Sequence, residues 1–408
     1  MRQDDFVKAV ESVGGSVYLV GGWVRDRLRG VEPQDKDFVV TGLERQTFMQ
    51  LFPQAALIGR SFPVYQMQID GVPSEIAFAR RERKSGRGYT GFSVDFGKEV
   101  TIEEDLFRRD TRINSMAFHL PKMEFIDPYD GRGDVAHRRI RATSHHFSED
   151  PVRALRAARQ AAEMGFSIDE DTVAQMTLCA AELAKEPHER VVHELSRALA
   201  APEPSRFFLA LAQANLLSAV FPEIFALQGK MQPVECHPEG DAFCHTMQIV
   251  DAVARVTPTL AARFAALVHD IGKGTTPKEM LPHHYGHEVR GVEVLESWNS
   301  RMTLPKTWMT AARFVIREHM RAPLLKKAGK IADLLFMIEK SGLSFPDFLC
   351  IIRADHGSLP PYLSRGAEML ERLRQVRGSE APPALYGAAV GKWLREERGR
   401  LLKRYLSA

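Results

Sequence analysis

Short apolar runs and helical segments are mixed in roughly the first third of the chain. The apolar runs predict β-strands at residues 17–20, 37–40, 64–69, 74–79 and 116–120. From about residue 148 this strand pattern almost disappears, and Ala-, Leu- and Arg-rich segments with helical periodicity follow, separated by proline-containing breaks. The pattern therefore predicts an α/β or α+β domain at the N-terminus and an all-helical remainder, with a boundary near residues 140–148.

Composition narrows the class of protein. The chain has 408 residues, of which 44% are hydrophobic and 26% charged, as in an ordinary globular protein too long for a single core. No apolar run reaches the ~18 residues that a membrane span needs, and the polar start has no apolar stretch typical of a signal peptide. Four cysteines without a C-x-x-C pair indicate reduced thiols, so we expect a cytoplasmic protein. The net charge of +3 identifies no partner.

The most informative stretch begins with an apolar strand that runs into Gly21 and Gly22. A helix carrying Arg25 follows, and a second strand opens with Asp35 and Asp37. Residues i and i+2 of a strand face the same side, so the two carboxylates converge and repel each other unless a divalent cation binds between them. Mg²⁺ suits such a pair, and glycines before a helix let backbone amides approach a phosphate. A glycine pair alone is usually a turn, and an Asp-x-Asp pair alone is usually a solvated strand end. Together the two features predict a nucleotidyl-transfer site.

Two adjacent arginines, Arg108 and Arg109, precede the last predicted strand. Such pairs are often simply solvated. In the same domain as a Mg²⁺ pair, however, a guanidinium fork that matches triphosphate oxygens is the better interpretation.

The helical body opens at Asp150, which fits a helix N-cap with Pro151 at the first helical position. Arg153, Arg156 and Arg159 then recur every three residues, as either a solvated stripe or a face left free for an anion or a base. If Asp150 and Arg153 both point at a base edge, the carboxylate accepts from an exocyclic amine and the guanidinium donates to the adjacent ring nitrogen. Cytosine and adenine both present a donor amine next to an acceptor ring nitrogen, whereas uracil and guanine reverse the donor and the acceptor.

Histidines and aspartates recur in the second half of the chain, at His245, His269, Asp270, His283, His284, His287, His319 and Asp355. His269 and Asp270 are adjacent inside an apolar helical segment, where two polar groups need a partner. Imidazole and carboxylate groups without a nearby thiolate suit a divalent transition metal or Mg²⁺. The alternative is a decayed hydrolase domain that is kept as a scaffold.

The chain resembles the bacterial class II tRNA nucleotidyltransferases, the CCA-adding enzymes, of the multifunctional type with an HD phosphohydrolase domain. The resemblance rests on motifs at Leu19–Asp26, Asp35–Asp37, Glu82–Phe92, Arg108–Asn114, Glu149–Arg153 and His269–Lys273. It implies an α+β fold in which a polymerase-β-type nucleotidyltransferase head, a mixed sheet with helices, precedes an all-α neck, body and tail. The expected parts are a head at 1–140, a nucleotide- and tRNA-binding neck at 141–230, an HD domain at 231–357 and a tail at 358–408.

The resemblance also implies roles for single residues. Asp35 and Asp37 would hold the catalytic Mg²⁺. The incoming nucleotide would be bound by Gly22, Arg25, Arg109, Asp150, Arg153, Arg156 and Arg159, with Asp150 and Arg153 reading the base. The HD metal, Ni²⁺ or Mg²⁺, would be held by His245, His269, Asp270 and Asp355. The stretch 82–92 resembles the flexible loop that family members need for the switch from C to A addition.

We therefore expect addition of C, C and A to the 3′ end of tRNA from CTP and ATP, by a monomer or homodimer that does not contact a membrane. The HD domain would add 2′-nucleotidase, 2′,3′-cyclic phosphodiesterase and phosphatase activities. The alternatives are an A-adding enzyme or a poly(A) polymerase, and an RNA-binding protein with an inactive head and a working HD domain. Glu75 is a candidate third carboxylate, although a cross-strand salt bridge is the favoured role.

Overall fold

The computed structural model describes residues 1–33, 35–58, 63–84, 86, 92–235 and 238–407. Its contacts divide the chain into two compact units. The first comprises Met1–Pro187 and Leu209–Ala219, and the second comprises His188–Phe208 and Val220–Ala408. Among the helices described, none combines the length and the apolar character that crossing a membrane would require.

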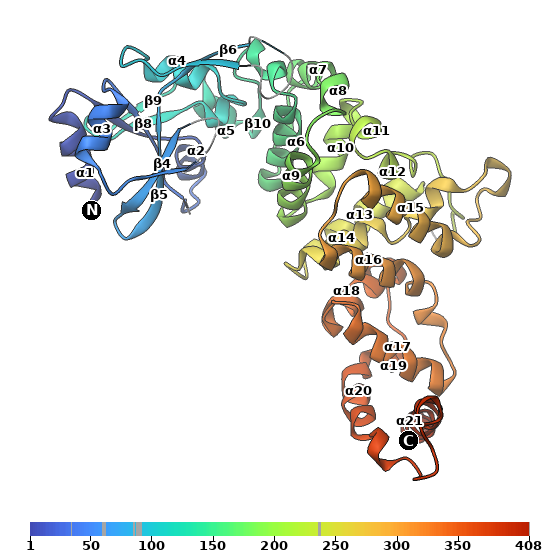
Figure 1. The fold of residues 1–408 in the computed structure, drawn as a ribbon. Coiled ribbons are helices and arrows are strands. Elements are labelled where there is room, and N and C mark those ends of the chain that lie inside the picture. Colours follow the sequence, from blue (N-terminus) through green and yellow to red (C-terminus); the bar gives the residue numbers. More distant parts are fainter. Residues whose placement is uncertain (34, 59–62, 85, 87–91, 236–237, 408) are drawn as a thin grey trace. The chain divides into compact units, whose positions relative to one another are not determined.

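A seven-stranded mixed sheet forms the centre of the first unit, in the blue and cyan part of Figure 1. Its strand order is β3-β4-β5-β2-β1-β8-β9, in which β2 and β5 are parallel and the other neighbours antiparallel. The strands are β1 (Ser16–Val20), β2 (Asp37–Thr41), β3 (Ala56–Ile58), β4 (Val64–Ile69), β5 (Val72–Phe78), β8 (Ala117–His119) and β9 (Glu124–Ile126).

Alternation along the strands builds a core on each face of this sheet. Val17 of β1 and Phe38 of β2 belong to the core cluster that also holds residues of α1 (Gln3–Glu11) and α3 (Arg45–Leu51). Val39 belongs to the opposite cluster, with residues of α4 (Ile102–Phe107). Because residues two apart on a strand share a face, Asp37 lies on the α4 side with Val39.

Shorter elements complete the first unit. Two further strand pairs are β6 (Arg81–Lys84) with β7 (Phe92–Asp95), and β10 (Arg139–Ile140) with β11 (Ser167–Ile168). The remaining helices that lie wholly in this unit are α2 (Gly22–Leu28), α5 (Gly131–Ala136), α6 (Val152–Met164), α7 (Glu170–Leu178) and α8 (Ala180–Leu183). The division between the units passes through α10 (Ser205–Gln213) and α11 (Leu217–Val220).

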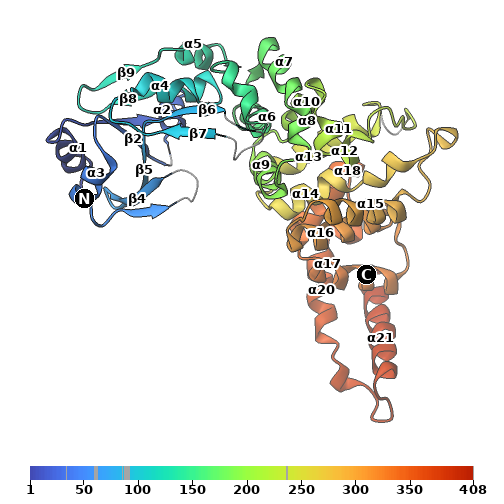
Figure 2. The ribbon, with the colours of Figure 1, turned by 45° about the horizontal axis from the view of Figure 1, so that its top comes forward.

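The second unit contains helices and no β-strand among its described residues, apart from an isolated bridge between Met231 and Asp241. Its helices are α9 (His188–Ala200), α12 (Pro222–Phe225), α13 (Ala242–Ala254), α14 (Leu260–Val268), α15 (His287–Arg301), α16 (Lys306–Glu318), α17 (Ala328–Lys340), α18 (Phe345–His356), α19 (Pro361–Ser364), α20 (Gly366–Gln375) and α21 (Ala388–Ser407). Figure 2 shows α20 and α21 side by side near the C-terminus. The buried helix α14 packs against α13, α16 and α18, so it forms the centre of the HD-like part.

The predicted fold class, a mixed-sheet head followed by a helical remainder, is confirmed. All five predicted strands are present within a few residues. The sequence pattern missed the short strands β3, β6, β7, β9, β10 and β11. Strand β2 begins at Asp37, so Asp35 lies in the preceding loop and not on the strand as predicted. Part of the predicted loop at 82–92, residues 85 and 87–91, lies outside the described residues.

Candidate functional site

Three carboxylates meet at the start of β2. The parallel register places Asp37 opposite Glu75 of β5. Although the Asp37 side chain still reaches solvent, desolvation raises the pKa of its carboxyl; Asp35 adds to this rise and Arg109 opposes it. Desolvation also raises the pKa of Glu75, with Asp37 and Asp35 contributing. Like charges held this close are stabilised by a divalent cation, so the arrangement fits a Mg²⁺ site.

The favoured role of Glu75 in a cross-strand salt bridge is not found. Within the described residues no Lys, Arg or His nitrogen lies within ion-pair distance of its carboxylate, and its neighbours across the strand are acidic. Glu75 therefore fits better as a third carboxylate of the cation site.

The glycine pair lies directly against the predicted arginines. Gly21 follows β1 with a φ of 63°, a conformation that favours glycine, and a Cβ there would lie 3.3 Å from Nη1 of Arg109. A Cβ at Gly22 would lie 3.6 Å from Nη2 of Arg25. Backbone amides, two guanidinium groups and the carboxylates of β2 and β5 are thus brought to one place, which suits a nucleoside triphosphate with its cation.

A buried carboxylate fixes the orientation of Arg109. Asp105 lies on α4, a helix that begins with a capping box between Thr101 and Glu104. Its oxygens accept hydrogen bonds from Arg108 at 2.7 Å and from Arg109 at 2.9 Å, and its side chain is fully buried. Burial alone would raise the pKa of Asp105, but the two guanidinium groups hold it at about 2.

We predict that Asp105→Asn destabilises the protein by about 3–5 kcal/mol at pH 7, because two arginines lose a buried partner. The folded-state pKa of about 2 lies below the ordinary value, so the stability that the carboxylate contributes is complete above about pH 4. This contribution is lost as the pH falls through about 2, so the difference in the free energy of unfolding between Asp105→Asn and the wild type shrinks there. Urea unfolding at several pH values measures this difference. Glu103→Gln, on the exposed side of α4, is the matched control, and a pH-independent difference for Asp105→Asn would contradict the assignment.

Asp110 ties α6 to the head within the first unit. Its buried carboxylate accepts hydrogen bonds from Arg156 at 2.7 Å and Gln160 at 3.1 Å, and also from Asn114 at 3.1 Å. Asn114 in turn accepts from Arg25 at 2.7 Å. Arg156 holds the pKa of Asp110 well below its ordinary range despite burial. A continuous chain of hydrogen bonds therefore connects two of the predicted nucleotide-binding arginines.

The predicted base-reading residues lie at the start of α6. The predicted N-cap position is one residue off, because α6 begins at Val152 and its N-cap is Pro151, but the Asp150 carboxylate still accepts a hydrogen bond from the Val152 backbone at 3.2 Å. The buried Arg153 donates to the backbone carbonyl of His146 at 2.8 Å and lies 3.8 Å from Glu82. Desolvation lowers the pKa of Arg153, an effect that Asp150 opposes.

The expectation of an arginine face left free on α6 is wrong in this structure. Arg153 and Arg159 are buried, and each of the three arginines has protein partners; Arg159 donates to Glu163 at 2.6 Å. Helix α6 is buried on nearly all sides, because it is packed inside the first unit and not laid on its surface. Of these three arginines, only Arg156 reaches solvent substantially, with 40% of its side chain exposed.

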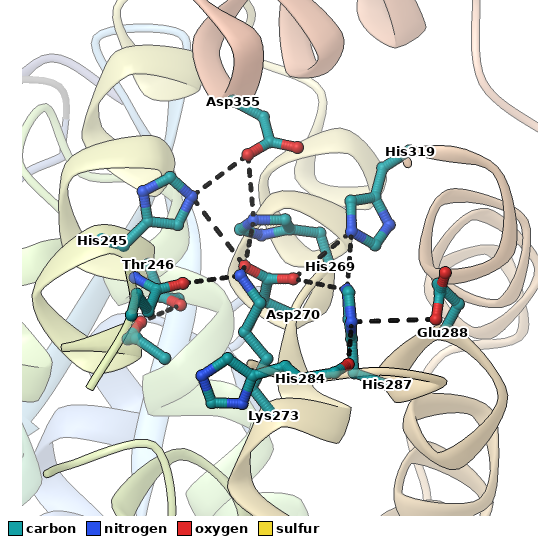
Figure 3. Close-up of polar contacts among 12 residues, drawn as sticks. His245, Thr246, His269, Asp270, Lys273, His284, His287, Glu288, His319 and Asp355 are labelled. Carbon is teal, nitrogen blue, oxygen red and sulfur yellow. Dashed lines mark hydrogen bonds and ion pairs between the residues drawn. The ribbon is translucent and has the colours of Figure 1, made fainter. Parts of the chain in front are cut away.

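The second unit brings the predicted metal ligands together from separate helices (Figure 3). His245 comes from α13 and Asp355 from α18, whereas His269 and Asp270 directly follow the last residue of α14. The Nε2 atom of His245 lies 3.1 Å from Asp355 Oδ1, and that of His269 lies 3.2 Å from Asp270 Oδ2. Buried groups of this kind, with one ligand atom each at close range, could hold a divalent cation.

Not every member of the histidine-rich stretch belongs to this cluster. His283 is exposed. His284 is buried, but its two ring nitrogens contact Thr276 Oγ1 at 2.8 Å and the Met231 carbonyl at 3.0 Å, which makes it structural. His287 alone of the three reaches Asp270, at 3.1 Å.

Several residues of both sites were missed by sequence reasoning. Asp105 on α4 lies four residues before Arg109, which follows the end of that helix, so i,i+4 spacing could have revealed it. Lys273, buried with its Nζ 2.5 Å from Asp270 Oδ2, follows the same logic at i,i+3. No local signal connects Asp110 with Gln160, fifty residues later, because only the packing of α6 brings them together.

Three segments of the chain match known families. Residues 17–141 match the Poly A polymerase head domain, residues 165–227 the probable RNA and SrmB-binding site of polymerase A, and residues 242–338 the HD domain. The chain is 44% identical to the multifunctional CCA protein of Aromatoleum aromaticum, over 90% of this chain and 91% of that protein. It is 38% identical to the multifunctional CCA protein of Paracidovorax citrulli, over 96% of this chain and 98% of that protein.

Solved structures share the fold. A CCA-adding enzyme in apo form II has a TM-score of 0.66 at 20% identity and covers 97% of this chain with 89% of its own. The Thermotoga maritima CCA-adding enzyme complexed with tRNA has a TM-score of 0.62 at 20% identity, with the same two coverages, 97% and 89%.

Proposed function

This chain belongs to the family of multifunctional CCA proteins, and we propose that it adds C, C and A in turn to the 3′ end of tRNA from CTP and ATP. The observation that carries the proposal is the meeting of Asp35, Asp37 and Glu75 with Arg109 beside the Gly21 turn. We keep the four-part division into head (1–140), neck (141–230), HD domain (231–357) and tail (358–408) as part of this proposal.

The residues of the head bind and orient the reactants. The 3′ hydroxyl oxygen of tRNA forms a bond to the α-phosphorus of the nucleotide, the bond to the β-phosphate oxygen breaks, and pyrophosphate leaves. Asp35, Asp37 and Glu75 would hold Mg²⁺, which when bound favours deprotonation of the hydroxyl and neutralises the leaving group. Arg25 and Arg109, fixed by Asn114 and Asp105, would hold the triphosphate in line with the attack.

Primers of defined length distinguish this activity from its closest alternatives. Transcripts of tRNA that end at the discriminator base, at C or at CC are incubated with each NTP alone. We expect CTP to be added to the first two and ATP only to the third. An A-adding enzyme would use only the CC primer, and a poly(A) polymerase would add several A residues to all three.

We further propose that Asp150 and Arg153 select the base. Asp150→Asn keeps an acceptor for the Val152 backbone amide but replaces an acceptor-only group by an amide that can also donate. A changed base contact of this kind alters the discrimination between the correct and the wrong bases by about 1–3 kcal/mol. We therefore expect UTP and GTP to gain roughly 5- to 150-fold relative to CTP and ATP in kcat/KM.

The control for this prediction is Asp169→Asn before α7, because Asp169 also accepts a hydrogen bond from the backbone amide two residues later. It is expected to leave nucleotide preference unchanged. Equal loss of activity with all four nucleotides in Asp150→Asn would show that Asp150 orients the helix and does not read the base.

For the second unit we propose a metal-dependent phosphohydrolase activity, with 2′-nucleotidase, 2′,3′-cyclic phosphodiesterase and phosphatase reactions. The support is the HD-domain match and the buried group of His245, His269 and Asp270, with Asp355 Oδ1 3.1 Å from His245 Nε2. Ni²⁺ or Mg²⁺ would be the ion; when bound it polarises a phosphoryl oxygen and activates water. Hydrolysis of each ester class in the presence of each ion tests this activity separately from nucleotide addition.

A further inference from the structure

We propose that a basic cavity between α17 and α21 binds a phosphate group, supplied by a free polyphosphate or by an RNA strand. The cavity has a volume of about 640 Å³, within the range of ordinary small-molecule sites. Lys326 and Lys327, directly before α17, line it from one side, and Arg400 and Lys403 of α21 line it from the other. None of these residues belongs to the proposed transferase site or to the proposed phosphohydrolase site.

Two glycines bring the helices together at this cavity. Helices α17 and α21 pack against each other, and a Cβ on Gly399 would lie 3.5 Å from the Cα atom of Gly329. Glu396, Gly399, Arg400 and Lys403 are spaced i, i+3, i+4 and i+7, so they share one face of α21. Because the backbones approach closely at the glycines, the long side chains of this face stand around a hollow.

The cavity carries an excess of positive charge. Four cationic side chains line it, Lys326, Lys327, Arg400 and Lys403, against the single carboxylate of Glu396. Arg400 lies 4.0 Å from Glu396 and 2.8 Å from Glu397, so the carboxylates that reach the cavity edge are paired with one arginine. Cations gathered in one hollow raise the local concentration of anions.

The start of α17 runs against the usual electrostatic preference of a helix. The positive end of the helix dipole favours acidic residues in the first turn, yet α17 has none there. Instead, Lys326 and Lys327 precede the helix and Lys330 lies in its first turn. No side chain accepts a hydrogen bond at the N-cap, and the first backbone amides of a helix have no acceptor within it. An anion in the cavity offsets this repulsion.

These groups fit a phosphate better than a carboxylate. Lysine ammonium, arginine guanidinium and backbone amides at a helix start are the donors that bind phosphate oxygens in proteins. A carboxylate brings one negative charge, whereas a phosphate monoester brings nearly two and a polyphosphate more. The larger charge matches the excess of cations over carboxylates in the cavity lining.

Hydrogen exchange gives a readout confined to this cavity, because it is measured on a peptide that covers residues 326–340 of the full-length chain. Inorganic tripolyphosphate and a tRNA transcript are the two probes, each compared with sodium chloride at the same ionic strength. We expect exchange in the first turn of α17 to slow roughly tenfold at ten times the dissociation constant of the bound probe. Protection by tripolyphosphate indicates that a free polyphosphate suffices, and protection by tRNA alone indicates a strand phosphate.

The test variant combines Lys326→Gln with Lys327→Gln and is expected to lose this protection. The matched control combines Lys392→Gln with Arg395→Gln, which removes the same charge from exposed positions of α21 outside the cavity, and keeps the protection. Without an added anion, the test variant is expected to melt at the wild-type temperature or higher, because it removes like charges from the helix start. A lower melting temperature would indicate that the lysines serve the fold and not a ligand.

Three results would overturn the proposal. They are exchange in the wild type that neither probe slows, protection that persists unchanged in the test variant, and an equal loss of protection in the control. The last result would mean that the anions respond to the net charge of the chain and not to the cavity.

Discussion

Asp37→Asn is expected to reduce nucleotide addition below about 1% of the wild-type rate, a loss of at least about 2.7 kcal/mol of barrier lowering. The Asp37 carboxylate lies opposite Glu75 and close enough to Asp35 for its pKa to rise. A neutral amide binds a divalent cation more weakly than this carboxylate. Single-turnover addition of CMP to a tRNA that ends at the discriminator base measures the effect.

Stability provides the internal check on this variant. The raised pKa of Asp37 means that its charge is unfavourable in the folded protein, so without Mg²⁺ the Asn variant is expected to melt at the same temperature or higher. Glu32→Gln removes an exposed carboxylate of the preceding loop and is the matched control. More than a few per cent of residual activity in Asp37→Asn, with an unchanged metal requirement, would contradict the assignment.

Asp270→Asn is expected to abolish phosphohydrolase activity, again to below about 1%, while CCA addition persists at the wild-type rate. Asp270 lies at the centre of the buried histidine cluster of the second unit, 3.2 Å from His269 and 3.1 Å from His287. All residues assigned to nucleotide addition lie in the first compact unit. Hydrolysis of a 2′,3′-cyclic nucleotide and CCA addition, measured on the same preparation, compare the two activities.

The same preparation also reports on folding. Asp270 is buried beside Lys273, and breaking a buried ion pair costs about 3–5 kcal/mol. His245→Asn is therefore made as a second variant that leaves this pair intact, with exposed His283→Gln as the control. A parallel loss of hydrolysis and CCA addition in folded His245→Asn would indicate that the two activities share a site.

The fold and the centre of the transferase site were predictable because their signals are local. Apolar runs marked the strands around the Gly21 turn, and the short spacing of Asp35 and Asp37 placed two carboxylates together even though Asp35 precedes the strand. A site whose residues lie close together in the sequence can be predicted from the sequence alone.

What the sequence could not provide depends on packing between distant segments. The stripe of Arg153, Arg156 and Arg159 has the spacing of a surface face, but burial of α6 gives each of them protein partners. Likewise, His284 and His287 are indistinguishable in the sequence. Only the fold turns His287 toward Asp270 and His284 toward the Met231 carbonyl.

The central claim is that this chain builds the sequence CCA on tRNA without a nucleic-acid template. It is tested most directly by incubating a tRNA transcript that ends at the discriminator base with all four nucleotides at equal concentration and sequencing the 3′ ends of the products. The account predicts products that end in CCA and stop there, with none formed by Asp37→Asn. Products that carry a run of A, or a transcript left unextended by the wild type, would contradict it.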